Sequence, residues 1–482
     1  MSQRDKSATV LPSGGLRLAG NIVHRERTFA VCYPYTGETI AHVSKATTDD
    51  VQLAFKVAAT FKSPLTRHQR YTVLMRARTK LTSEISTWAH RITLESGLCL
   101  KDTWHEVGRA CDVLLLAANQ SLIDDGQVFS CDITERGQER KAYTTRDPLL
   151  GAISAITPFN HPLNQVVHKV APAIATNNRI VLKPSEKTPL SALAFADLMY
   201  ESGLPPEMFQ VLTGSPTEIG DALVTDPYID LVTFTGSSQV GREIATKVGY
   251  KRIILELGGN DPLIVLEDAD VIMAAKIAAQ GAFRNSGQRC TAVKRILVHN
   301  SIADEFALAL LSETRTLRSG DPFDPMIDVG TVIDAGAAAS LHGLVENAIA
   351  SGAVLLYGGD RQDSLLKPTV LDNVLPRMQV VTQEAFGPIA PLIRFQDVSE
   401  AITFVNESRY GLSAGVCTKR LDYAMRFIKE LHVGTVNINE APGYRMESTP
   451  FGGIKDSGLG YKEGVIETMK AYTNLKTYSI PW

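Results

Sequence analysis

The stretch from Leu149 to Gly259 alternates short apolar runs with amphipathic ones, and this limits the possible folds more than any other feature. Such alternation is typical of β-α-β units that build a parallel sheet. Five runs are predicted to be strands: GAISAI, RIVLK, MFQVLTG, LVTFTG and RIILELGG (Gly151–Ile156, Arg179–Lys183, Met208–Gly214, Leu231–Gly236 and Arg252–Gly259). The predicted class is therefore α/β, with ligands expected beyond the carboxyl ends of the strands.

Four sequence signals predict helix starts between these strands. They are a proline in the first turn (Pro162), a Thr-Pro pair (Thr188-Pro189), a capping-box pattern (Ser215–Glu218) and a small-residue turn (Gly236–Gly241). The apolar residues after Pro162 recur at three- and four-residue steps, so this helix should bury one face on the sheet. The start at Gly236 also bears on function, because free backbone N–H groups at a helix N-terminus can face a phosphate.

Charge balance and composition exclude several function classes. The 482 residues include 49 Lys+Arg and 52 Asp+Glu, a formal charge of -3, without the basic excess typical of nucleic-acid-binding proteins. No stretch approaches the roughly 18 uninterrupted apolar residues of a membrane span, and the charged first residues contain no signal-peptide core. We expect a cytoplasmic protein of about three structural units that binds neither nucleic acid nor membrane.

Short motifs of other classes are absent as well. The sequence contains no GxGxxG and no GxxxxGK[ST]. Its six cysteines form no CxxC pair, and His105-Glu106 is followed by Arg109 where HExxH requires a second histidine. We therefore expect reduced thiols and no metal site.

One cysteine stands in a chemically distinctive setting. The run NSGQRCTAVKR (Asn285–Arg295) places Cys290 among small, polar and basic residues, directly after Arg289. A neighbouring cation lowers the pKa of a thiol and enriches the nucleophilic thiolate. From composition alone, however, most such cysteines are inert.

Seven motifs, in order along almost the whole chain, resemble those of the aldehyde dehydrogenase superfamily. They are TPFNHP (Thr157–Pro162), LKPSE (Leu182–Glu186), FTGSSQVG (Phe234–Gly241), LELGGNDP (Leu255–Pro262), GQRC (Gly287–Cys290), EAFGP (Glu384–Pro388) and PFGGIKDSGLG (Pro450–Gly460). The resemblance implies a Rossmann-type NAD-binding domain (1–127 and 146–258), an α/β catalytic domain (259–450) and a small β oligomerisation element (128–145 and 466–482).

The resemblance also implies catalytic roles. Cys290 would attack the aldehyde carbon to give a thiohemiacetal, whose oxyanion the Asn160 amide and the Cys290 N–H would stabilise. Hydride would then pass to the nicotinamide and leave a thioacyl enzyme. Glu256 would activate the water that releases the acid. The different-class alternative is a non-catalytic binding or structural member of the fold, which should have lost at least one of these residues.

Cofactor residues are implied in the same way. Lys183, Ser185 and Glu186 match the adenosine-ribose positions, although Lys183 and Glu186 alone would also suit a solvated surface pair. The pyrophosphate and nicotinamide-ribose positions match Gly236, Ser237, Glu384 and Phe386. A carboxylate beside the ribose hydroxyl repels a 2′-phosphate, so NAD is preferred, with NADP as the alternative.

Four basic residues suggest the substrate. Arg109 lies on the predicted helix WHEVGRACDVLLLAA, His161 follows Asn160, Arg289 precedes the thiol, and Arg445 lies before Pro450. Each could be an ordinary solvated or paired side chain, but together they suggest an anionic aldehyde. Arg109 and Arg289 resemble the phosphate-holding pair of non-phosphorylating glyceraldehyde-3-phosphate dehydrogenases, and His161 resembles phosphonoacetaldehyde dehydrogenases. Phosphonoacetaldehyde is the predicted substrate; glyceraldehyde 3-phosphate, lactaldehyde and succinic semialdehyde are alternatives.

The oligomerisation element has its own sequence signals. TERGQER (Thr134–Arg140) supplies a glycine-centred turn inside a hairpin-like segment, Val128–Thr145. The resemblance pairs this hairpin with a strand around Asn474–Ile480. Because such a ribbon is marginally stable alone, we expect a homodimer or homotetramer.

Overall fold

A seven-stranded sheet forms the first half of the molecule. The computed structural model describes residues 14–481; residues 1–13 of the predicted NAD-binding domain and residue 482 of the predicted oligomerisation element lie outside the described residues. The strand order is β11 (Arg252–Glu256), β10 (Ile229–Thr235), β7 (Ala152–Ile156), β8 (Ile180–Lys183), β9 (Phe209–Val211), β1 (Leu16–Leu18) and β2 (Asn21–Val23). The five predicted strands are confirmed and run parallel, and β1 and β2 extend the sheet antiparallel.

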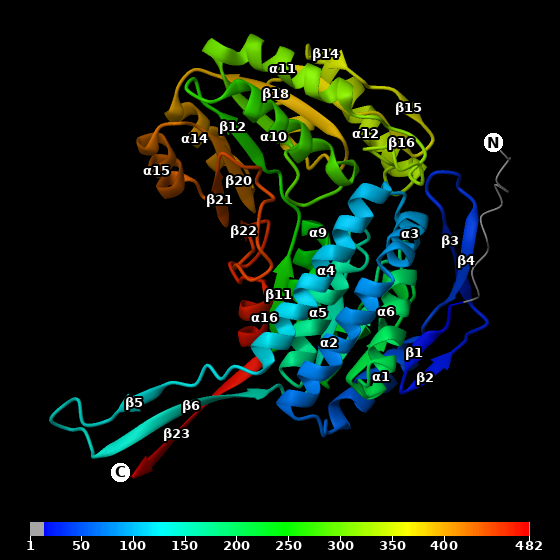
Figure 1. Cartoon of the computed structure of the whole chain (residues 1–482), viewed down its shortest axis with the longest axis vertical. Helices are drawn as coiled ribbons and strands as arrows, with labels where there is room; N and C mark the ends of the chain where they lie inside the picture. Colours follow the sequence, from blue (N-terminus) through cyan, green and yellow to red (C-terminus); the bar gives the residue numbers. More distant parts are fainter. Residues whose placement is uncertain (1–13, 482) are drawn as a thin grey trace.

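Helices cover both faces of this sheet because its strand residues alternate between two cores. Ile153 and Ile180 pack in one cluster with the helices α2, α4, α5 and α6, whereas Ala152 and Val181 pack in another with α1 and α8. The bounds of these helices, with α3 and α9, are α1 (Thr48–Thr60), α2 (Arg67–Ser83), α3 (Ile85–Ser96), α4 (Leu100–Ser121), α5 (Asn164–Ala175), α6 (Leu190–Glu201), α8 (Ala222–Thr225) and α9 (Ser238–Lys247). The helices α2 to α6 form the layer seen at the centre of Figure 1.

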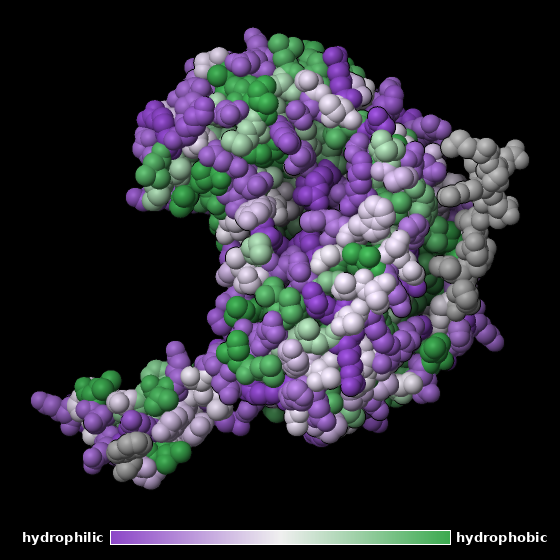
Figure 2. Space-filling model, viewed as in Figure 1, coloured by the Kyte–Doolittle hydropathy of each residue, from purple (hydrophilic) through white to green (hydrophobic). Residues whose placement is uncertain are grey.

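A second seven-stranded sheet forms the other lobe, at the top of Figure 1. Its order is β14 (Val354–Tyr357), β17 (Thr369–Asp372), β18 (Ile389–Phe395), β13 (Arg295–His299), β12 (Pro262–Val265), β20 (Ser413–Cys417) and β21 (Thr435–Ile438), with only β14 antiparallel. Helices of this lobe include α10 (Val271–Phe283), α11 (Ala303–Thr316), α12 (Ala335–Ala350), α14 (Val398–Glu407) and α15 (Leu421–Glu430). Figure 2 shows hydrophilic side chains in the hollow between this lobe and the helical layer.

A three-stranded arm projects from the body (Figure 1). It joins β5 (Val128–Ser130), β6 (Arg140–Pro148) and β23 (Thr473–Pro481), so the predicted hairpin and its pairing with the C-terminal strand are observed. The predicted element 466–482 is strand only from Thr473 on. Residues before it belong to α16 (Val465–Ala471), which packs on α4 and α5 through the first core.

Two helix starts differ from prediction. Pro162 lies in the turn before α5 rather than in its first turn, because the Glu106 carboxylate accepts the backbone N–H groups of Leu163 and Asn164 (2.8 and 3.0 Å) and fixes the start there. The predicted capping box at Ser215 is wrong. Its hydroxyl lies 2.7 Å from that of Thr217, and α7 (Pro216–Ile219) is a single turn without a side-chain cap.

Within residues 14–481, no helix is long and apolar enough to cross a bilayer. The same residues contain no cluster of three or more His, Cys, Asp or Glu side chains suited to a metal ion, and all six cysteines are free thiols.

Candidate active site

Cys290 lies on a tight loop between α10 and β13, which we call the nucleophile loop (residues 285–290). Three consecutive residues, Asn285, Ser286 and Gly287, have left-handed backbones with φ of 58°, 51° and 70°. A Cβ on Gly287 would lie 2.1 Å from the carbonyl oxygen of Gly387, so only glycine fits there. The turn reverses the chain and brings Cys290 into the hollow between the two lobes.

Asn160, at the end of β7, is locked against this loop. Its side-chain amide donates to the carbonyl of Gln288 (2.9 Å), and the Asn285 amide donates back to the Asn160 carbonyl (3.0 Å). One amide N–H of Asn160 remains, and the backbone N–H of Cys290 has no acceptor within residues 14–481. Two donors are thus available beside the sulfur, as an oxyanion site requires.

The environment of the Cys290 thiol favours its neutral form. Burial raises the pKa of the thiol to about 11; Lys294 and Arg445 act against this, and Asp261 adds to it. The prediction that Arg289 lowers the pKa of the Cys290 thiol is therefore wrong. The Arg289 Nη2 instead donates to backbone carbonyl oxygens, at 2.6 Å from that of Gly281.

Glu256 ends β11 and shares a narrow cavity of about 60 Å³ with Cys290. Its side chain is buried, and its Oε1 has no hydrogen-bond partner within the described residues. Burial, reinforced by the neighbouring Glu463, raises the pKa of Glu256 well above its ordinary value despite the opposing charge of Lys169. The surroundings of the carboxyl group thus favour its protonated form, and its use as a base requires loss of that proton.

A cavity of about 520 Å³ opens on the other side of the thiol. It brings together six of the predicted residues: Asn160, Gly236, Ser237, Cys290, Glu384 and Phe386. Ser237 caps α9, accepting the N–H of Val240 (3.4 Å), so a helix N-terminus faces this cavity as predicted.

The lining of this cavity fits a nicotinamide dinucleotide. A Cβ on Gly236 would lie 2.4 Å from the Phe234 ring, and one on Gly258 would lie 2.1 Å from Oε2 of Glu384, so a larger residue at either position would displace a side chain of the cavity. The buried hydroxyl of Thr235 faces the cavity without a partner among the described residues. Close backbone approach and unpaired polar groups suit a phosphate- and ribose-bearing ligand.

Lys183, Ser185 and Glu186 lie at the end of β8 and do not line this cavity. The Lys183 ammonium is buried, donates to the carbonyl of Pro184 (3.0 Å) and lies 3.5 Å from the Glu186 carboxylate. Burial lowers the pKa of Lys183. The alternative of a solvated surface pair is therefore wrong for Lys183. That Lys183, Ser185 and Glu186 hold the adenosine ribose remains a prediction.

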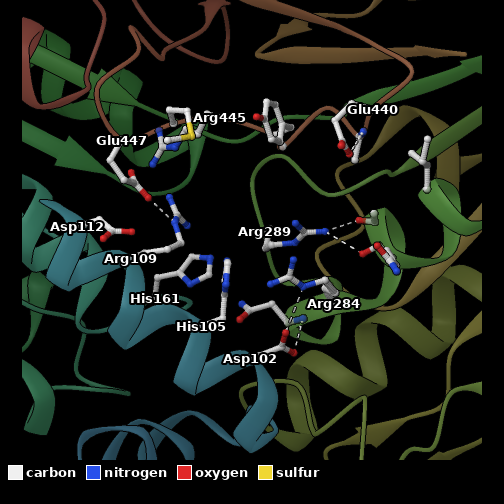
Figure 3. Close-up of a pocket in the computed structure, with 18 of the residues that line it drawn as sticks. Asp102, His105, Arg109, Asp112, His161, Arg284, Arg289, Glu440, Arg445 and Glu447 are labelled. Carbon is white, nitrogen blue, oxygen red and sulfur yellow. Dashed lines mark hydrogen bonds and ion pairs between the residues drawn. The ribbon is translucent and has the colours of Figure 1, made fainter. Parts of the chain in front are cut away.

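A third cavity, of about 530 Å³, lies beyond the thiol and is shown in Figure 3. The four predicted substrate residues line both this cavity and the narrow one that ends at Cys290: Arg109, His161, Arg289 and Arg445. Figure 3 shows the three guanidinium groups entering one space from α4, the nucleophile loop and the segment after β21. Residues far apart in sequence are thus brought together as predicted.

Arg109 is held by a buried carboxylate. Its Nε donates to Oε1 of Glu447 (2.5 Å), whose Oε2 lies 2.7 Å from Nε2 of His168 on α5. Burial alone would raise the pKa of Glu447, but His168 and Arg109 outweigh burial and hold it well below its usual range. The terminal nitrogens of Arg109 have no partner among residues 14–481 and are free to bind a ligand.

The other two arginines also present unused nitrogens. Arg445 makes no hydrogen bond within the described part of the chain and lies over the Phe451 ring, 4.0 Å from its centroid. The Arg289 Nε is buried without a partner there. Burial lowers the pKa of Arg289 to about 10, so it stays protonated at neutral pH.

The charge balance near the thiol is positive. Of the two carboxyl groups in the narrow cavity, Glu256 has surroundings that favour its neutral form, and Glu463 is paired with Lys169 (2.8 Å). In the 530 Å³ cavity Asp102, Asp112 and Glu440 contribute negative charge, and Arg284 lies 3.6 Å from Asp102. The unpaired positive charge is therefore concentrated on the side of the cavity that leads to Cys290.

Sequence reasoning missed the residues that hold these groups in place. Glu447 positions Arg109, Glu106 caps α5 and lies 3.4 Å from His161, and Lys294 lies beneath the nucleophile loop. No local sequence pattern identifies these residues. Glu447 and Glu106 act on residues more than fifty positions away, and Lys294 acts through a turn that its spacing in the sequence does not reveal.

This chain is similar in sequence and structure to known proteins. The pattern of the aldehyde dehydrogenase family matches residues 22–478. The 3-sulfolactaldehyde dehydrogenase of Priestia aryabhattai is 38% identical over 459 residues, covering 95% of this chain and 96% of that protein.

The chain belongs to the aldehyde dehydrogenase family.

Two further relatives agree with this aldehyde dehydrogenase assignment. Lactaldehyde dehydrogenase of Methanococcus maripaludis is 35% identical over 93% of this chain and 96% of its own length. The structure of NADP-dependent glyceraldehyde-3-phosphate dehydrogenase from Bacillus halodurans, complexed with NADP, superposes with a TM-score of 0.94 at 34% identity, covering 97% of this chain and 99% of that one. The predicted superfamily and fold class are confirmed, and the chain is an aldehyde dehydrogenase.

Proposed function

We propose that this aldehyde dehydrogenase oxidises a short aldehyde carrying an anionic group, with phosphonoacetaldehyde converted to phosphonoacetate. One observation supports this most: Arg109, Arg289 and Arg445 direct unpaired guanidinium nitrogens into the cavity that ends at Cys290. Guanidinium forks match the oxygens of phosphonate, sulfonate or carboxylate. An anion held there would leave the aldehyde end of the molecule directed toward the sulfur.

The residues around the thiol supply the proposed chemistry. The Cys290 thiol loses its proton to solvent, its sulfur bonds to the aldehyde carbon, and the carbonyl oxygen becomes an oxyanion held by the Asn160 amide and the Cys290 N–H, at about 3 kcal/mol per donor. Bound NAD(P) would supply the hydride acceptor, so that a thioacyl group would remain on Cys290. Glu256, after losing its own proton to solvent, takes a proton from water, whose oxygen attacks the thioacyl carbon and releases the acid and the thiol.

The cofactor is NAD(P), and the chain offers two sites for its parts. Glu384, Gly236, Ser237 and Phe386 would hold the nicotinamide and pyrophosphate end in the 520 Å³ cavity. The adenosine end would lie near Lys183, Ser185 and Glu186. The Glu186 carboxylate favours NAD over NADP, because it would repel a 2′-phosphate.

A second candidate substrate is 3-sulfolactaldehyde. The observation favouring it is the 38% identity to an enzyme of that name over nearly the full chain. A sulfonate presents three oxygens to the arginines, as a phosphonate does, with one charge fewer. Glyceraldehyde 3-phosphate and succinic semialdehyde also carry anions, whereas lactaldehyde would leave the arginines unpaired.

We also propose a homodimer or homotetramer joined through the arm of β5, β6 and β23. Six large apolar side chains of the arm are exposed: Val128, Phe129, Ile133, Leu475, Tyr478 and Ile480. A second copy of the chain would cover them, since a three-stranded ribbon has little core of its own. A cytoplasmic location stays a prediction.

NADH formation with purified enzyme tests the substrate proposal. The panel is phosphonoacetaldehyde, 3-sulfolactaldehyde, glyceraldehyde 3-phosphate, succinic semialdehyde and lactaldehyde. We expect the highest kcat/KM for phosphonoacetaldehyde. A preference for another anionic aldehyde would contradict the assignment of phosphonoacetaldehyde but support the anion site. A preference for lactaldehyde would contradict both the assigned substrate and the anion site.

A further inference from the structure

Lys294 lies between the nucleophile loop and the cofactor cavity, just before β13. Its side chain is 1% exposed. All three ammonium protons have acceptors: the carbonyl oxygens of Gly259 (2.8 Å) and Cys290 (3.3 Å), and the Glu384 carboxylate. A buried lysine with three directed bonds is fixed in position, and it fixes the groups around it.

Glu384 is held through only one of its oxygens. Its Oε1 accepts both the Lys294 ammonium and the backbone N–H of Gly259 (3.2 Å). Its Oε2 accepts no hydrogen bond from the described residues, and a Cβ on Gly258 would lie 2.1 Å from it. The free oxygen therefore belongs to the 520 Å³ cavity, where Glu384 and Phe386 form part of the wall.

The same ammonium acts on the nucleophile. Among the charged groups around Cys290, Lys294 has the largest effect in favour of the thiolate, ahead of Arg445. Asp261 and Glu256 favour the neutral thiol, as burial does. Lys294 also lies 5.0 Å from the centroid of the Phe386 ring, on the cofactor side.

We propose that Lys294 is a positioning residue that locks Glu384 in its ligand-binding orientation and, from the same position, supplies the main cation attracting the Cys290 thiolate. The grip on the cofactor and the reactivity of the nucleophile then depend on one side chain. The inference rests on the proposed function only in taking Glu384 as a cofactor ligand. An ordinary structural ion pair would affect stability but neither of these two properties.

The test compares Lys294→Met and Lys294→Gln with the wild-type full-length enzyme. Alkylation of Cys290 by iodoacetamide without cofactor is followed across pH at the peptide level by mass spectrometry, with exposed Cys32 as the internal control. Binding of NAD is measured by calorimetry. Melting curves establish that each variant is folded.

In both variants we expect Cys290 alkylation at neutral pH to slow about tenfold, with the pH midpoint moving upward and Cys32 unchanged. In Lys294→Met the Kd for NAD should rise roughly tenfold, and in Lys294→Gln less, because an amide can still donate to Glu384. If Lys294→Met is unfolded, Lys294→Gln decides by its alkylation profile and its smaller rise in Kd. An unchanged alkylation profile or an unchanged Kd in a folded Lys294→Met would overturn the inference. Failure of the anionic-aldehyde proposal would appear separately, as wild-type preference for a neutral aldehyde.

Discussion

The Cys290 thiol shows how opposing residue-scale effects combine. Burial favours the neutral thiol, and Lys294 and Arg445 favour the thiolate, yet the pKa of Cys290 stays at about 11. At neutral pH, without ligands, only a small fraction of the sulfur is therefore ionised. The neighbouring donors of Asn160 and the backbone are positioned for the charge that develops on the aldehyde oxygen rather than on the sulfur.

Cys290→Ala should abolish aldehyde oxidation while leaving the Kd for NAD within about twofold of wild type, because the sulfur is the nucleophile and the cavity wall is otherwise intact. Cys32→Ala, at an exposed thiol, is the matched control and should retain full turnover. NADH absorbance and calorimetry measure the two properties. Retained turnover in Cys290→Ala would remove it from the nucleophile's role.

Acid release should speed up as pH rises above 4.5, the ordinary pKa of a glutamate. The pKa of Glu256 is raised, so the carboxyl is protonated at low pH and the general base appears only as the proton is lost. Glu256→Gln should give one burst of NADH and then turn over roughly 10²–10⁴-fold more slowly, without this pH dependence. Stopped-flow absorbance measures both phases; exposed Glu305→Gln is the control, and steady turnover in Glu256→Gln is the contrary result.

Individual roles were only partly predictable from the sequence. Asn160, Glu384 and Cys290 were found because each belongs to a contiguous motif. Arg289 was expected to tune the thiol because it is adjacent in sequence, but neighbouring residues on a turn point in different directions, and its Nη2 bonds to backbone carbonyls. Lys294, four residues after Cys290, acts more strongly on the sulfur because the loop folds back over it.

At the scale of elements, two buried carboxylates fasten α4 and α5 together. Glu106 of α4 caps the N-terminus of α5, and Glu447 joins Arg109 of α4 to His168 of α5. These contacts hold α4, which carries Arg109, against α5, which begins just after His161. The substrate cavity therefore keeps its shape through interactions one layer behind its surface.

Glu447 should also make stability depend on pH. Its folded-state pKa is depressed, so its contribution is present above its ordinary pKa of 4.5 and is lost as pH falls below that value. Between pH 5 and 3.5 the wild-type free energy of unfolding should fall by roughly 1 kcal/mol more than that of Glu447→Gln. Denaturant unfolding at several pH values measures this, with Glu305→Gln as control; equal slopes in wild type and Glu447→Gln would contradict it.

Elements with a repeating apolar pattern were predictable and those fixed by distant contacts were not. The five parallel strands and α4 follow directly from apolar runs in the sequence. The start of α5 was misplaced because Glu106, 58 residues before Asn164, sets it. The failed capping box at Ser215 has a similar cause, since the Glu218 carboxylate bonds to Arg27 (2.9 Å) instead of reaching back.

At the scale of the whole molecule, the arm is the part least explained by the single chain. Its strands β6 and β23 pair along their full length, and Tyr143 stacks on Tyr478 with centroids 5.4 Å apart. Figure 2 shows apolar residues on its surface, away from both cores. The separation of its strands by more than three hundred residues was inferable only through the family resemblance, because no local pattern links them.

Leu475→Asp together with Ile480→Asp should shift the proposed oligomer toward monomer, because both side chains are about half exposed on the arm and would be covered by a partner. Light scattering coupled to gel filtration measures the mass. Leu308→Asp, on an exposed position of α11, is the control and should leave the mass unchanged. A wild-type monomer, or an unchanged oligomer in the double variant, would contradict the proposed role of the arm.

The most direct measurement of the anion site is the ratio of kcat/KM for phosphonoacetaldehyde to that for 3,3-dimethylbutanal, in which a neutral tert-butyl group replaces the phosphonate. In Arg109→Ala, Arg289→Ala and Arg445→Ala we expect this ratio to fall roughly 10- to 100-fold, mainly through KM for the anionic aldehyde. Arg284→Ala, beside Asp102 and outside the narrow cavity that ends at Cys290, should change this ratio far less. Equal losses on both aldehydes in the three variants would show that these arginines do not bind the anionic group.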